Sequence, residues 1–109
     1  ALVPRRFFVY VIELETAVGQ IRKFRKANPD MRAGASCFYV GSSFQTPDNR
    51  FDQHKQGYKS NRYARKFGFK LRPDLFDRYN PIPTRKDALE IEEYLAERLR
   101  GEGFGVWQG

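Results

Sequence analysis

The sequence predicts an α+β domain with a small three-stranded, mainly antiparallel sheet flanked by helices. Three short segments, 7–14, 37–41 and 75–79, are rich in β-branched and aromatic residues and have the composition of strands. The segments between and after them carry helix start and stop signals, which gives the order β-α-β-α-α-β-α. A length of 109 residues suits one domain with one core.

The first helix is expected between the first two strands. Thr16 would cap it, and it would run to about Ala27, where Asn28-Pro29-Asp30 stops it. Its apolar face would consist of Val18, Ile21 and Phe24.

Two helices are expected after the second strand. Thr46 followed by Pro47 starts the first, which ends at Gly57. Ser60 would cap the second, a basic helix that Gly68 closes.

After the third strand, Thr84 starts the last long helix, which runs to about Arg100. The tail, 104–108, is apolar enough to pack back on the domain.

Charge and composition favour a polyanionic partner. Lys plus Arg total 20 against 13 for Asp plus Glu, for a net charge of +7 and a pI of about 9.8. Cations that neutralise phosphates release counterions, so nucleic acid is the expected partner. No apolar stretch reaches membrane-spanning length, and no secretory signal is visible.

The single cysteine, Cys37, excludes an internal disulfide and fits a reducing compartment, so a cytoplasmic location is expected. Residues 1–6 are interpreted as an N-terminal extension, because Leu2-Val3-Pro4-Arg5 resembles a protease site used in expression vectors. The domain itself would span 7–109.

Four chemically useful pieces occur in a fixed order along the chain. They are Tyr10 in the first strand, Tyr39-Val40-Gly41 in the second, Arg50 with His54 four residues later in a helix, and Glu92 in the last helix. Each piece alone is weak, whereas their order and spacing together are specific.

Together these pieces resemble the GIY-YIG nuclease superfamily. Tyr39-Val40-Gly41-Ser42 matches the second motif of the family, and Arg50 with His54 matches its Arg-x-x-x-His helix. Glu92 matches the catalytic Glu of the last helix. Only Tyr10 of the first motif is present. After the strand that carries it, residues from about 15 to 36 form an insertion. The family often ends in a functional Asn, for which Gln108 is the nearest polar candidate.

The resemblance implies a Mg²⁺-dependent endonuclease that hydrolyses DNA phosphodiester bonds in a repair- or structure-related role, with RNA left open. Glu92 would bind the metal, for which Mn²⁺ can substitute, because carboxylate oxygens are hard ligands. Arg50 would bind phosphate oxygens through its planar fork of donors. The alternative is a nucleic-acid-binding module on the same scaffold that cleaves poorly.

The roles of the other three catalytic candidates are less determined. Tyr10 is the expected general base and Tyr39 its phosphate-contacting partner, although the two roles could be exchanged. His54 would position a water or help a Tyr lose its proton. Both Tyr side chains could instead be core aromatics. Helical spacing puts Glu92 beside the apolar stripe and Glu93 on the outer face, so Glu93 is only a fallback.

Two basic segments are candidate nucleic-acid contacts. One consists of Arg62, Tyr63, Arg65 and Lys66; the other, in the insertion, is represented by Arg22 and Lys23. A solvated helix face explains either segment almost as well. The oligomeric state and the preferred substrate structure are not determined by the sequence.

Overall fold

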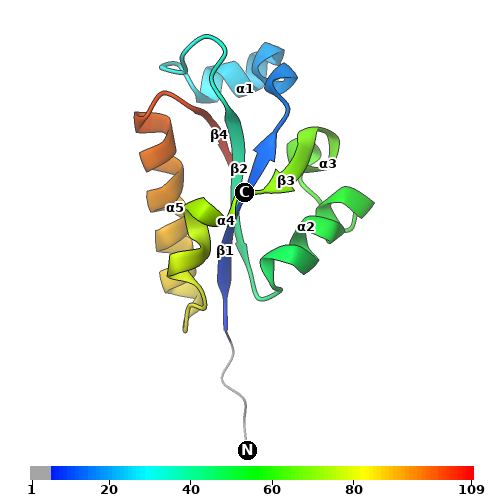
Figure 1. The fold of residues 1–109 in the computed structure, drawn as a ribbon, viewed down its shortest axis with the longest axis vertical. Coiled ribbons are helices and arrows are strands. Elements are labelled where there is room, and N and C mark those ends of the chain that lie inside the picture. The colour runs from blue at the N-terminus through cyan, green and yellow to red at the C-terminus, as the bar shows by residue number, and fades with distance from the viewer. Residues whose placement is uncertain (1–5) are drawn as a thin grey trace, which may run out of the picture.

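The computed structural model describes residues 6–109, and over this range the chain forms a mixed sheet of four strands (Figure 1). The strands are β1 (Phe8–Leu14), β2 (Cys37–Ser43), β3 (Gly68–Leu71) and β4 (Gly105–Gln108), in the spatial order β3-β1-β2-β4. β1 is antiparallel to both β2 and β3, whereas β4 is parallel to β2. The predicted α+β class is confirmed, and the sheet is mainly antiparallel as predicted, but it has four strands rather than three and one parallel pairing.

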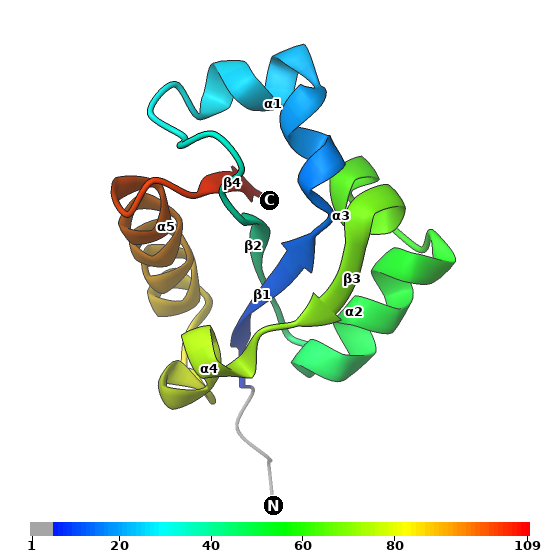
Figure 2. The same cartoon turned by 45° about the horizontal axis from the view of Figure 1, so that its top comes forward.

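Helices cover both faces of the sheet. They are α1 (Arg22–Ala27), α2 (Pro47–Gln56), α3 (Arg62–Phe67), α4 (Pro73–Phe76) and α5 (Arg85–Gly101), with 3-10 turns η1 (Thr16–Gln20) and η2 (Asp77–Tyr79). α5 lies on one side of the sheet, and α2 with α3 on the other (Figures 1 and 2). Within residues 6–109, none of these helices has the length and hydropathy needed to cross a bilayer.

The predicted third strand, Leu75–Tyr79, is helical. Pro73 occupies the first helical position of α4, where its fixed φ favours a helix, and Asp74 lies in the first turn. The chain instead forms the short strand β3 just before this proline, at Gly68–Leu71. The apolar side chains of 75–79 therefore pack from helical turns rather than from a strand.

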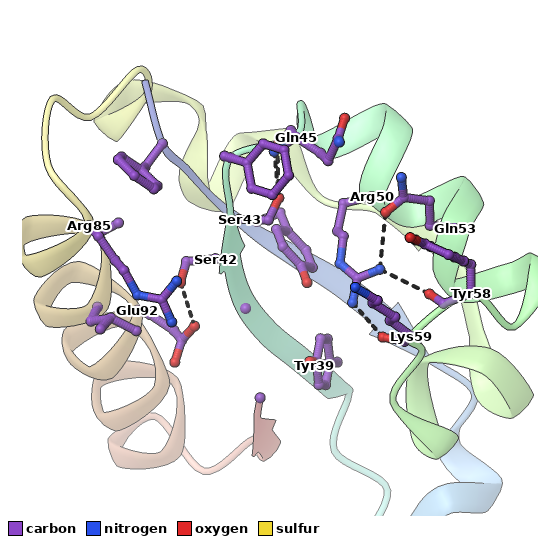
Figure 3. A pocket seen from close by; sticks show the side chains of 17 residues that line it. Tyr39, Ser42, Ser43, Gln45, Arg50, Gln53, Tyr58, Lys59, Arg85 and Glu92 are labelled. Atoms are coloured by element: carbon purple, nitrogen blue, oxygen red, sulfur yellow. Dashed lines mark hydrogen bonds between the residues drawn. The ribbon is translucent and has the colours of Figure 1, made fainter. Parts of the chain in front are cut away.

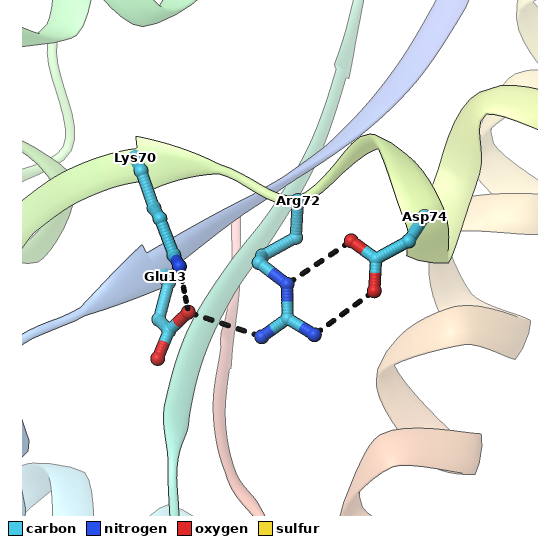
Figure 4. Close-up of polar contacts among 4 residues, drawn as sticks. All are labelled: Glu13, Lys70, Arg72 and Asp74. Carbon is cyan, nitrogen blue, oxygen red and sulfur yellow. Dashed lines mark hydrogen bonds and ion pairs between the residues drawn. The ribbon is translucent and has the colours of Figure 1, made fainter.

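An ion-pair cluster fastens β3 and α4 to β1 (Figure 4). Arg72 Nη1 lies 3.0 Å from Glu13 Oε1, and its Nε and Nη2 contact both carboxylate oxygens of Asp74 at 3.0 and 2.9 Å. Lys70, the cross-strand partner of Glu13, lies 3.7 Å from the same Glu13 oxygen. Arg72 therefore lies closer to Glu13 than Lys70 does, and its bidentate contact with Asp74 holds the guanidinium in position for Glu13.

The predicted helix from Thr16 to Ala27 is two short pieces. η1 and α1 are separated at Ile21, which is extended with φ −77° and ψ 123°, and no side chain caps either piece. Gly19 has low helix propensity and lies just before this break. The cap predicted at Ser60 is also displaced, because Asn61 Oδ1 accepts the backbone N–H groups of Tyr63 and Ala64.

The other two predicted caps are confirmed. Thr46 Oγ1 accepts from Asn49 N at 3.3 Å, and Thr84 Oγ1 accepts from Asp87 N at 3.1 Å. These caps fix where α2 and α5 begin. They thereby set the register of the two helices that carry the polar candidates.

The apolar tail does pack back on the domain, and it forms β4. Asn28 holds it in place: its Nδ2 donates to the carbonyls of Phe24 and Val106, and its Oδ1 accepts from Val106 N and Arg100 Nε. Because Asn28 is buried, these bonds have no competition from bulk water. One side chain thus joins α1, α5 and β4.

We expect Asn28→Ala to lower the free energy of unfolding by about 2 kcal/mol or more, because the Phe24 carbonyl and the buried Val106 N–H lose their bonds to Asn28 and the Val106 carbonyl keeps only Arg100 Nη2. Urea denaturation measures this change. Asn49→Ala, an exposed Asn in the first turn of α2, is the matched control and should change little. Equal urea midpoints for Asn28→Ala and the unaltered chain would contradict the role of Asn28 in holding β4.

Candidate functional site

The site lies at the C-terminal end of β2, where β1 pairs with one side of the strand and no described strand pairs with the other. β4 pairs with β2 only over 37–40, so 41–43 form a free edge within the described part of the chain. A cleft of about 760 Å³ surrounds this edge. Its lining includes Tyr10, Tyr39, Ser42, Arg50, Arg85 and Glu92.

The free edge lets both faces of the sheet contribute to one cleft. Side chains alternate along β2, so Tyr39 and Ser42 point to opposite faces. Arg85 and Glu92 lie on one side of β2 and Arg50 on the other (Figure 3). The structure therefore brings the predicted phosphate-binding and metal-binding residues to opposite walls of the same cleft.

The β1–β2 register places both candidate Tyr side chains on one face. Tyr10 pairs with Gly41 and Ile12 pairs with Tyr39, and directly opposed residues share a face. The two Tyr ring centroids are 6.1 Å apart. A Cβ on Gly41 would lie 2.5 Å from the Tyr10 hydroxyl, so Gly41 is needed to let the phenol cross the neighbouring strand.

His54 is fully buried beside both Tyr rings, and its hydrogen bonds determine its tautomer. The backbone N–H of Asn61 donates to Nδ1 at 3.1 Å, so Nδ1 carries no proton. In a neutral imidazole the proton is then on Nε2, which lies 2.9 Å from the Tyr10 hydroxyl and donates to it. Burial, and then the Arg50 charge, lower the pKa of His54 from 6.5 to about 4.

This geometry narrows the role predicted for His54. A nitrogen that already donates to Tyr10 cannot accept the proton of that Tyr. His54 can assist only by donating to the phenolate oxygen once the proton has left. Burial raises the pKa of Tyr10 well above its ordinary value; Tyr39 adds to this, and Arg50 opposes it. Burial likewise raises the pKa of Tyr39.

Arg50 is held by the loop that follows its own helix. Nη2 donates to the Lys59 carbonyl at 2.6 Å, and Nη1 donates to the Tyr58 carbonyl at 3.2 Å and to Gln53 Oε1 at 3.1 Å. Gly57, at φ 85°, ends α2 in the left-handed region and starts this loop. The contacts use three of five N–H groups, which leaves two for an oxygen in the cleft.

Glu92 is held from two strands. Ser42 Oγ donates to Oε1 at 2.9 Å, and Gln108 Nε2 donates to Oε2 at 2.8 Å. Glu92 is buried, with only 3% of its surface accessible, whereas the fallback candidate Glu93 is exposed to solvent. Burial raises the pKa of Glu92, while Gln108, Ser42 and the Arg85 charge oppose the rise.

Sequence reasoning missed Ser42 and Arg85 as site residues. Ser42 directly follows the Tyr-Val-Gly motif, and alternation along the strand turns it toward α5. Arg85 is a cation at the first position of α5, where a helix favours anions. That unfavourable placement is a usable signal for a functional residue.

The cleft fits one hydrated divalent cation better than a closed metal cage. Residues 6–109 contain no group of three His, Cys, Asp or Glu side chains that could hold a metal. Glu92 has the one carboxylate side chain among the described residues that line the cleft. Each of its oxygens keeps a free lone pair, and Mg²⁺ typically binds through one or two carboxylates while keeping its waters.

The predicted nucleic-acid contacts lie outside this cleft. Arg62, Arg65 and Lys66 are exposed on α3, and Arg22 and Lys23 are exposed on α1. The prediction for Tyr63 is wrong, because this side chain is 2% exposed and its ring packs against Phe24 and Trp107. It serves the core that joins α1, α3 and β4.

The low pKa of His54 predicts a pH-dependent stability. Between about pH 6.5 and 4 the unfolded chain takes up a proton that the folded His54 does not, so the free energy of unfolding should fall as the pH falls through this window, by up to about 3 kcal/mol. Urea denaturation from pH 7.5 to 4 measures it.

His54→Gln is the control, because it retains every other titrating group. It should reduce the slope in this window, and equal slopes in the two proteins would contradict the assignment. Nitrogen-15 NMR of the imidazole should show an unprotonated Nδ1 and a protonated Nε2 at pH 7.

Comparison with known protein families places the chain in one family. The family model of the GIY-YIG catalytic domain matches residues 7–103. No significant match was found among curated proteins or among solved structures. GIY-YIG domains are in general endonucleases, typically metal-dependent, and act on nucleic acid. The chain belongs to the GIY-YIG nuclease superfamily.

Proposed function

We propose that the protein is a metal-dependent endonuclease that hydrolyses DNA phosphodiester bonds in a repair- or structure-related role. The observation that carries this proposal is the pair formed by Arg50 and Glu92 across one cleft, with Tyr10 and Tyr39 also lining it. A cation and an anion held apart by a cleft can bind a phosphodiester at one wall and a metal ion at the other.

Arg50 would bind the scissile phosphate. Its guanidinium is fixed by two backbone carbonyls before substrate arrives, so little ordering is needed on binding. Its remaining donors would neutralise charge that develops on the phosphate oxygens during displacement.

Glu92 would hold Mg²⁺, or Mn²⁺ in its place, through the lone pairs that Ser42 and Gln108 leave free. Such an ion supplies acidified water and neutralises charge at phosphorus. The two hydrogen bonds keep the Glu92 carboxylate oriented and favour its ionised form.

Tyr10 and Tyr39 would order the attacking water beside the phosphate, with Tyr10 as the proposed general base. Its raised pKa means that Tyr10 is a phenol at neutral pH in the free protein. To act as a base it must lose its proton when charges in the cleft lower that pKa, and the Nε2–H of His54 would then stabilise the phenolate. The roles of Tyr10 and Tyr39 remain exchangeable.

A catalytically weak nucleic-acid-binding module is the second candidate. The exposed basic residues of α1 and α3 favour binding whether or not the cleft cleaves. DNA is preferred here as the substrate, with RNA as the alternative. A cytoplasmic location fits the single buried thiol, Cys37.

We expect Arg50→Ala and Glu92→Gln each to lower the nicking rate at least about 100-fold in Mg²⁺, because each removes charge stabilisation in the transition state. A plasmid nicking assay, repeated on single-stranded, duplex and branched DNA and on RNA, measures it. Glu93→Gln is the matched control, one residue along on the outer face of α5, and should retain the full rate.

Cleavage that survives both Arg50→Ala and Glu92→Gln would refute the proposed site. Salt-dependent binding by the intact protein without cleavage of any of these substrates would favour the binding module instead.

Removal of the Gln108 amide should shift the pH dependence of cleavage. Gln108 stabilises the ionised form of Glu92, so Gln108→Ala should raise the midpoint of the acidic limb of the rate profile by about one pH unit. Single-turnover rates between pH 5 and 8 measure this. An unchanged acidic limb would show that Glu92 does not control it.

A further inference from the structure

Exposed apolar side chains gather at the cleft. Five large apolar residues are well exposed within residues 6–109, and three of them, Phe44, Tyr58 and Leu89, line the cleft. Phe44 is the most exposed of the five, at 70%. Exposed aromatics that cluster at a site for a polyanion need an explanation other than core packing.

Phe44 projects from a tight turn at the end of β2. The Ser43 hydroxyl accepts the backbone N–H of Gln45 at 3.0 Å and donates to the Gln45 carbonyl at 2.9 Å. Both neighbours of Phe44 line the cleft (Figure 3). The turn fixes the backbone of Phe44 and leaves its ring in solvent.

A second hollow adjoins the cleft at this point. It measures about 610 Å³ and is lined by Arg6, Phe7, Phe44 and Arg85. The last three of these residues also line the cleft, so the two spaces lie side by side. Among the described residues, no carboxylate lines this outer hollow, which therefore combines two cations with two aromatic rings.

We propose that the outer hollow binds an unpaired nucleotide next to the scissile phosphate. The base would stack on the Phe44 ring, and Arg85 and Arg6 would contact the adjoining phosphate. Stacking on an aromatic ring does not require a particular base, because every base has a π face. This inference rests on the proposed nuclease function and adds a substrate class to it.

The substrate class follows from the geometry of stacking. A base inside a duplex has both faces covered by its neighbours, so it cannot offer one to Phe44. A flap, a single-stranded overhang or a bulge supplies an exposed base beside a duplex. A protein partner or a second copy of the chain would cover Phe44 equally well, but a hollow with two arginines and, among residues 6–109, no acidic lining residue favours a phosphate-bearing ligand.

Oligonucleotide binding tests the inference, with the divalent ion chelated so that no cleavage occurs. The probes are a duplex with a single-stranded flap and its fully paired counterpart, measured by fluorescence anisotropy. A 2-aminopurine at the first unpaired position reports stacking by fluorescence quenching.

We expect Phe44→Leu to weaken binding of the flap about tenfold, to abolish the quenching and to leave duplex binding unchanged. Phe44→Trp should restore flap affinity. Phe69→Leu is the matched control, because it removes an exposed aromatic side chain of β3 that does not line the cleft. It should change neither the flap affinity nor the quenching. Because Phe44 is exposed, these substitutions should not unfold the protein.

Equal flap affinity for Phe44→Leu and the intact protein would overturn the inference, even if the intact protein cleaves DNA. Equal losses for flap and duplex would also overturn it, as would a dimer in sedimentation that Phe44→Leu dissociates. Flap binding with quenching but no cleavage in Mg²⁺ would support the inference and refute the nuclease proposal, so the two failures can be told apart.

Discussion

The free edge of β2 is the constraint on which the candidate site depends. β4 covers β2 over 37–40 and then ends at Gln108, which leaves 41–43 uncovered within residues 6–109. Side chains on opposite faces of a strand normally lie in different environments, because the sheet separates them. At an uncovered edge they can meet, and this is how Arg50 from one face and Glu92 from the other line one cleft.

Three polar side chains of the site are held by hydrogen bonds from neighbouring elements or loops. Asn61 at the start of α3 fixes the His54 tautomer, the loop after α2 holds the Arg50 guanidinium, and β2 and β4 hold the Glu92 carboxylate. A buried polar group without such partners is costly, so these bonds keep the side chains in one geometry. The exposed Phe44 differs, because only its backbone is fixed.

Local signals located some elements well and others poorly. The caps at Thr46 and Thr84 were read correctly, since a cap depends on a few neighbouring residues. The aromatic and apolar residues Leu75, Phe76 and Tyr79 favour a third strand at 75–79, but Pro73 starts a helix there. The true strand, β3, is short and partly polar; its pairing with β1 and the contacts of Arg72 with Glu13 and Asp74 hold it in place. Such long-range ties leave no local pattern in the sequence.

The sequence by itself determined the family, through Tyr39-Val40-Gly41, the Arg50–His54 spacing and Glu92, because a motif within one helix or strand fixes which side chains share a face. It also separated Glu92 from Glu93 by helical periodicity alone. Only the tertiary structure decided that Tyr10 lies across Gly41, that His54 donates to Tyr10, and that Gln108 contacts Glu92. These facts depend on strand register and on the parallel placement of β4, which arise from packing between segments far apart in the chain. The burial of Tyr63 has the same origin: its helix looks basic along the sequence, yet packing against Phe24 and Trp107 turns this one side chain inward.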